Sequence, residues 1–169
     1  MDMHFSLLPK LMADSVIQLT PEYLRSLDIR LLMLDFDNTI VPYTSNEPTP
    51  EMSGWLDAIL ASDIAVCVVS NSKRERVKVF CQARNIPCIT HSKKPFSKGI
   101  RQCLGQFNMK PEHCALAGDQ IYTDTLGANC MGVRSVLVRA IDNHNFWLKL
   151  RHVAELPFIA LAYKRRIKL

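Results

Sequence analysis

Short apolar runs that end abruptly at polar or acidic residues constrain the fold of this chain more than any other feature of its sequence. The first is Leu31-Leu32-Met33-Leu34, which stops at Asp35. A short, uniformly apolar run is typical of a strand buried on both faces of a parallel sheet. Four more short and mostly apolar runs follow, over residues 64–69, 88–90, 114–117 and 135–138. We therefore expect five buried strands.

The stretches between these runs have helical patterns. Thr20-Pro21-Glu22 and Thr49-Pro50-Glu51 each supply an N-cap, a proline at the first helical position and an acid in the first turn. The second is followed by apolar residues at helical spacing, namely Met52, Trp55, Leu56, Ile59 and Leu60. Further helices are expected near residues 73–84, 96–107 and 126–131. Strands that alternate with helices imply right-handed crossovers, so the predicted fold class is α/β with a doubly wound parallel sheet.

Length and composition favour one domain. The 169 residues, 48% of them hydrophobic, suffice for one substantial core and are too few for two ordinary domains. We expect a single domain over residues 1–169, with its motifs within about 30–140 and helical extensions at both ends. No apolar run approaches the roughly 18 residues that span a bilayer, and the start lacks a secretory pattern. The six cysteines have no metal-binding spacing. A cytoplasmic protein without a transmembrane helix is expected.

Polar residues gather at the ends of the expected strands, where doubly wound sheets place their sites. Four carboxylates and one lysine belong to this set, together with Thr39, Ser70 and Asn71: Asp35, Asp37, Asp119, Asp124 and Lys94. Any single Asp after a strand is more often a helix N-cap or a turn residue. Capping does not explain the whole set, however. Several carboxylates held together need a neutralising cation, and oxygen ligands favour a hard ion such as Mg²⁺.

The order of these residues resembles the motifs of the haloacid dehalogenase (HAD) superfamily over about residues 30–140. The matching motifs are Asp35-x-Asp37-x-Thr39, Ser70, Lys94 and Gly118-Asp119-x-x-x-x-Asp124. Within that superfamily the chain is similar to the YqeG branch of subfamily IIIA, on the strength of Ser70-Asn71, Lys94-Pro95 and the segment 118–129. Ala128, where glycine is usual, and Ser72, where asparagine is frequent, depart from that pattern.

The resemblance implies a role for each motif residue in phosphate ester hydrolysis. Asp35 would be the nucleophile that forms an aspartyl-phosphate, Asp37 the general acid and base, and Thr39 a residue that orients their loop. Ser70, Asn71 and Lys94 would bind the substrate phosphate. Mg²⁺ would be held by acids that follow two of the expected strands: Asp35, Asp37 (through its backbone carbonyl), Asp119 and Asp124.

The spacing of the motifs also bears on the substrate. Residues 40–69 and 72–93 leave no room for an inserted cap domain, so we expect a capless enzyme whose site is open to large or surface-bound phosphates. The branch is related to mitochondrial phosphatidylglycerophosphate phosphatases, which makes that lipid the first substrate hypothesis. Protein or nucleotide phosphates are the enzymatic alternatives. A receiver-type signalling domain would carry its phosphorylated Asp on the third strand, which here ends in Thr90-His91. A non-catalytic HAD-fold binding module is a further alternative.

The C-terminal segment joins an apolar patch, residues 158–163, to the basic residues Lys164, Arg165, Arg166 and Lys168. Such a segment favours a weak, salt-sensitive contact with anionic phospholipid at the membrane surface. A C-terminal helix that packs on the sheet and ends in solvated charges is the alternative interpretation. No nucleic acid is expected as a partner.

Overall fold

The apolar run Leu31–Leu34 forms strand β2, with all four residues buried, at the centre of a parallel sheet. The computed structural model describes residues 5–73, 75–142 and 157–161. In these residues the sheet has six strands in the order β1-β6-β5-β2-β3-β4, and every neighbouring pair is parallel. The other strands are β1 (Leu11–Ala13), β3 (Ala65–Val69), β4 (Cys88–Ile89), β5 (Cys114–Gly118) and β6 (Arg134–Val138).

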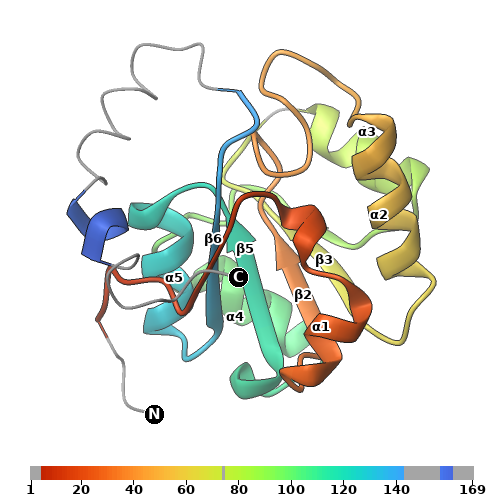
Figure 1. The fold of residues 1–169 in the computed structure, drawn as a ribbon. Helices are drawn as coiled ribbons and strands as arrows, with labels where there is room; N and C mark the ends of the chain where they lie inside the picture. Colours follow the sequence, from red (N-terminus) through yellow and green to blue (C-terminus); the bar gives the residue numbers. More distant parts are fainter. Residues whose placement is uncertain (1–4, 74, 143–156, 162–169) are drawn as a thin grey trace.

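Helices cover both faces of this sheet (Figure 1). They are α1 (Pro21–Ser26), α2 (Pro50–Leu60), α3 (Glu75–Ala83), α4 (Lys98–Gln106) and α5 (Leu126–Cys130), with short turns η1 (Val16–Gln18), η2 (Pro111–His113) and η3 (Ile121–Thr125). The hydroxyls of Thr20 and Thr49 accept hydrogen bonds from the first turns of α1 and α2, as their sequence pattern predicts. The predicted α/β fold class is confirmed.

Alternate residues of β2 face two different cores, because successive side chains of a strand point to opposite faces. Leu32 and Leu34 pack with α1, α2 and α3, whereas Leu31 and Met33 pack with α4 and α5. The central strands are therefore covered on both faces, which explains why their sequences are uniformly apolar.

The N-terminal extension, which is expected to be helical, contains the short helix α1 and also a strand that the sequence analysis does not predict. Leu11–Ala13 form β1, which pairs in parallel with β6 and is the edge strand of the sheet. Asn129 holds the preceding segment, since its side-chain amide donates to the carbonyls of Ser6 at 2.7 Å and Leu8 at 2.9 Å. The spacing of apolar residues over 5–11 fits an extended segment as well as a helix, and three residues are too few to show a strand pattern.

Near the C-terminus, residues 157–161 are helical. Phe158 and Ile159 pack against a small core cluster of Met12, Ile121 and Leu137. The basic residues Lys164, Arg165, Arg166 and Lys168 lie outside the described residues. Among the described helices, none has the length and apolar character to cross a membrane.

The two connections in which a cap domain would be inserted, from β2 to β3 and from β3 to β4, are short. A loop and α2 join β2 to β3, and α3 joins β3 to β4. The strand order reverses on either side of β2, so the crevice at the carboxyl ends of the central strands is the place where this fold class binds ligands.

Candidate active site

The residues that follow β2 begin the site. The backbone N–H of Asp35 donates to the carbonyl of Ala117 at 2.9 Å, which extends the pairing of β2 with β5 by one residue. Asn38 then adopts a left-handed conformation (φ 63°), which asparagine tolerates better than most residues. Its side-chain oxygen accepts a hydrogen bond from the N–H of Tyr43 at 2.9 Å. The resulting turn keeps Asp37 beside Asp35 and buries Thr39.

Lys94 connects the acids of two strands. Its Nζ lies 2.7 Å from Oδ1 of Asp35 and 2.7 Å from Oδ1 of Asp124, and it donates to the carbonyl of Val69 at 2.5 Å. The Lys94 side chain is 1% exposed. Burial works against its charge, but the carboxylates of Asp124 and Asp35 outweigh burial and hold the pKa of Lys94 above its usual value. Burial also raises the pKa of Asp35 to about 6, against the lowering influence of Lys94.

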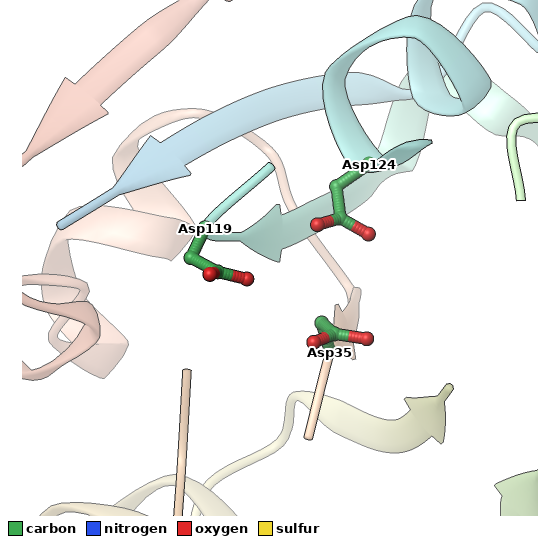
Figure 2. Close-up of side chains that lie close together, drawn as sticks. All are labelled: Asp35, Asp119 and Asp124. Atoms are coloured by element: carbon green, nitrogen blue, oxygen red, sulfur yellow. The ribbon is translucent and has the colours of Figure 1, made fainter. Parts of the chain in front are cut away.

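Three carboxylates converge on the same space. Figure 2 shows Asp35, Asp119 and Asp124, whose nearest oxygens all lie within 4.8 Å of one another. Asp124 is oriented by the backbone N–H of Gln120, which donates to its Oδ2 at 3.2 Å. Gly118 makes room for it, because a Cβ at this position would lie 2.3 Å from Cγ of Asp124. Three carboxylates against the single ammonium of Lys94 leave two negative charges, and this oxygen-only cluster fits a hard divalent cation.

Asn71 holds the loop that carries Lys94. Its Oδ1 accepts hydrogen bonds from the N–H of Lys94 at 2.7 Å and the hydroxyl of Ser92 at 2.8 Å, while its Nδ2 donates to the carbonyl of Lys94 at 2.9 Å. The preceding residue, Ser70, is buried, and its hydroxyl accepts a hydrogen bond from the N–H of Ser72 at 3.0 Å. Ser70 therefore keeps its hydroxyl proton for donation. The resemblance implies that Asn71 binds phosphate. In the structure its side chain instead holds the loop that carries Lys94.

Asp37 lies next to the three-carboxylate cluster but its carboxylate is not part of it. It forms an ion pair with Arg76 of α3, a residue that the sequence analysis does not identify. Arg76 also donates to the carbonyl of Ser45, and its guanidinium lies 5.2 Å from the ring centroid of Phe36. The side chain of Arg76 is 13% exposed. A cation at the start of the helix after Ser70 was the available signal, although its pairing with Asp37 depends on the fold.

The predicted site residues therefore come together at one edge of the sheet. Asp35, Lys94, Asp119 and Asp124 form the centre. Ser70 and Asn71 follow β3 and Thr39 lies in the turn after β2. Among the described residues, the hydroxyl of Thr39 makes no hydrogen bond, so the structure assigns it no partner in orienting the loop.

Comparison with known proteins identifies relatives of this chain. The model of the family described as "Mitochondrial PGP phosphatase" matches residues 2–141. The protein named "Probable phosphatase YqeG" from Bacillus subtilis (strain 168) is 33% identical over 131 residues, which cover 78% of this chain and 76% of that protein.

Two solved structures share the fold. The cobalt-bound form of the deoxy-D-mannose-octulosonate 8-phosphate phosphatase from Haemophilus influenzae is similar with a TM-score of 0.55 and 14% identity, covering 81% of this chain and 91% of that one. A protein assigned to the hydrolases of HAD superfamily subfamily III A, from Legionella pneumophila, has a TM-score of 0.52 and 13% identity. The match covers 85% of this chain and 94% of that one.

Proposed function

The chain belongs to the family described as mitochondrial PGP phosphatases and is a HAD-type phosphatase, and from this premise we propose that it hydrolyses phosphatidylglycerophosphate through a phosphorylated Asp35. The observation that carries the proposal is the position of Lys94, 2.7 Å from both Asp35 and Asp124. A buried ammonium between two acids places one cation where a phosphoryl group would bring its negative oxygens.

The proposal includes Mg²⁺, and the donor set supports it. Asp35, Asp119 and Asp124 offer carboxylate oxygens within 4.8 Å of one another, and Lys94 neutralises only one of their three charges. Such hard oxygen donors suit Mg²⁺. The structural neighbour from Haemophilus influenzae, a phosphatase, was solved with cobalt bound. When bound, the ion would neutralise charge on the phosphoryl oxygens and help to align the ester for attack.

The first chemical step is attack by a carboxylate oxygen of Asp35 on phosphorus. The new bond between Asp35 and phosphorus forms as the bond from phosphorus to the ester oxygen breaks. Asp37 enters this step in its protonated form and gives its proton to the freed alcohol. In the second step water attacks phosphorus, Asp37 takes a proton from that water, and the bond to Asp35 breaks. Inorganic phosphate leaves and both acids return to their starting state.

The groups around these acids would bind the phosphate and hold its charge. Lys94 would donate to the phosphoryl oxygens, and the Ser70 hydroxyl, which already accepts a bond from the Ser72 N–H, would donate its proton to another. Asn71 would act as a positioning residue, since its amide fixes the backbone of Lys94 on both sides. Without a cap between β2 and β4, a phosphate that stays anchored in a membrane would reach these groups.

Membrane contact through the C-terminus is part of the same proposal. Lys164, Arg165, Arg166 and Lys168 would attract anionic lipid, each contributing about 1 kcal/mol near such a surface. Phe158 and Ile159 pack against the core, whereas Leu161 is exposed, so only the exposed part of the apolar patch could assist the basic residues in this contact.

A substrate comparison tests the proposal. Purified protein with Mg²⁺ is given phosphatidylglycerophosphate in mixed micelles, a soluble aryl phosphate, a phosphopeptide and a nucleotide, and released phosphate is measured. The proposal predicts the highest kcat/KM for the lipid and no turnover in excess chelator. A higher kcat/KM for the phosphopeptide or the nucleotide would overturn the lipid assignment, and full activity in chelator would overturn the metal.

A further inference from the structure

One stretch of the chain is basic and carries no acid. Residues 76–111 contain eight Lys and Arg residues and no Asp or Glu, whereas the whole chain has 21 basic and 16 acidic residues. Four of the eight are paired with carboxylates from neighbouring segments: Arg76 with Asp37, Lys78 with Glu75, Arg84 with Glu47, and Lys94 with Asp35 and Asp124. Within the described part of the chain, the other four, Lys93, Lys98, Arg101 and Lys110, form no ion pair.

Three of these cations flank an exposed aromatic residue in the sequence. Phe96 is 73% exposed, and Lys93, Lys98 and Arg101 are exposed beside it in sequence, on the loop after β4 and the first turns of α4. We call these four residues the 93–101 surface. Lys94 belongs to the same loop and points inward to Asp35. The 93–101 surface therefore lies at the carboxyl end of β4, on the edge of the sheet that carries the site.

The loop that presents Phe96 is tightly held. The N–H of Gly99 donates to the carbonyl of Ser92 at 3.1 Å, and a Cβ at Gly99 would lie 2.4 Å from Cβ of Ser92. Gly127 of α5 also lies close to the loop, because a Cβ added at Gly127 would be 3.3 Å from Cα of Pro95. With Asn71 bonded to Lys94, the loop is fixed from three directions. An apolar ring fixed outward among uncompensated cations fits an external partner better than a role in the core.

We propose that the 93–101 surface docks this chain on a membrane that contains anionic phospholipid, and so brings the site to a phosphate at the headgroup level. The inference rests on the proposed function for its choice of substrate. Lys93, Lys98 and Arg101 complement the negative surface, while the Phe96 ring enters the interface, where aromatic side chains are favoured.

Other exposed apolar residues near the site favour lipid over a phosphopeptide or a nucleic acid. Tyr43 is 40% exposed after β2, and Ile141 is 41% exposed after β6. These two segments are joined, because the N–H of Ile141 donates to the carbonyl of Asn38 at 2.9 Å. Apolar side chains thus border the site on more than one side. A bilayer interface offers apolar surface to all of them at once, which a charged strand or peptide does not.

A charge-matched pair of variants tests the docking surface in the full-length chain. The test variant is Phe96→Gln with Lys98→Gln and Arg101→Gln. The control is Leu60→Gln with Lys10→Gln and Lys110→Gln, which removes the same charge and one exposed apolar side chain at the amino ends of strands, away from the site. Binding to sedimenting phosphatidylcholine vesicles with and without phosphatidylglycerol is measured, and melting temperatures confirm that both variants fold.

The wild type should bind the anionic vesicles, more weakly as salt rises because the Debye length shrinks from about 10 Å at 0.1 M to about 3 Å at 1 M. The test variant should lose at least about tenfold in affinity, and the control should stay within about twofold of the wild type. Equal vesicle binding by the two variants would overturn the inference. So would an unchanged vesicle affinity together with loss of binding to a phosphopeptide or to single-stranded DNA. Because these vesicles contain no phosphate monoester, a chain that docks this way but does not hydrolyse phosphatidylglycerophosphate would support docking and contradict the proposed substrate.

Discussion

At the level of single residues, Lys94 neutralises one of the three carboxylate charges of the site. Its ammonium is buried between the carboxylates of Asp35 and Asp124, at 2.7 Å from each. A buried charge is tolerated when it is paired, and removal of one partner leaves the others without compensation. The same lysine would then serve two purposes, because it stabilises the fold of the free protein and would bind the phosphoryl oxygens of a substrate.

Lys94→Met should therefore lower both stability and activity. We expect the free energy of unfolding to fall by about 3–5 kcal/mol, since buried carboxylates lose their counter-charge. Urea unfolding measures this loss, with Lys78→Met as a matched control whose exposed ion pair should matter by less than about 1 kcal/mol. A Lys94→Met protein as stable and as active as that control would show that the fold and the reaction do not depend on the ammonium beside Asp35 and Asp124.

Arg76 yields the second prediction at this scale. Its ion pair with Asp37 and its bond to the Ser45 carbonyl fix the proposed acid and base relative to the loop after β2. Arg76→Gln should reduce kcat about ten- to a hundredfold with little change in KM, because misplacement of a catalytic group slows the chemical step. Arg76→Lys should recover part of the loss. The control is Arg84→Gln, which removes the arginine that directly follows the same helix and pairs with exposed Glu47. Equal kcat for the two Gln variants would leave Arg76 without a positioning role.

These two residues also show what sequence reasoning can reach. The sequence predicts Lys94 at the site because it follows a buried strand, and the carboxyl ends of parallel strands share one edge of the sheet. Arg76 was missed because its partner Asp37 is 39 residues away and the pairing requires α3 to start beside the turn after β2. A motif locates groups at strand ends, whereas contacts between a helix and a loop depend on the packed fold.

At the scale of elements, strand length decided what the sequence could predict. Strands β2, β3, β5 and β6 are four or five residues long, mostly apolar and largely buried, so the sequence predicts them clearly. β1 has three residues at the sheet edge, and its position depends on contacts from distant segments. Asn129 supplies such contacts, with bonds to Ser6, Leu8 and Ser135.

Asn129→Ala should loosen this edge of the sheet. The variant removes bonds to two backbone carbonyls and to the Ser135 hydroxyl, so we expect a loss of about 1–3 kcal/mol in the free energy of unfolding. Hydrogen exchange at residues 11–13 should accelerate more than exchange in β2. Asn46→Ala, in an exposed loop, serves as the control. If exchange in β1 were unchanged, Asn129 would not be what fixes the N-terminal segment.

At the scale of the whole molecule, an acidic cluster and a basic surface occupy neighbouring positions at the carboxyl ends of the strands. The acids Asp35, Asp119 and Asp124 meet at the carboxyl ends of the central strands, while the 93–101 surface places unpaired cations beside them. The cluster would draw in a divalent cation and the cations would draw in anionic lipid. This separation comes from topology, because residues far apart in sequence reach the same edge through parallel strands.

The most direct test of the account is phosphate release from phosphatidylglycerophosphate by the wild type and by Asp35→Asn. The substitution keeps the shape of the side chain and removes the nucleophilic carboxylate, so the account predicts a fall in kcat of more than about a thousandfold. A cooperative melting transition and an unchanged circular dichroism spectrum would confirm that the variant folds. Turnover by the folded variant within about tenfold of the wild type, measured with the same lipid and Mg²⁺, would contradict the assignment of Asp35 as the residue that accepts the phosphoryl group.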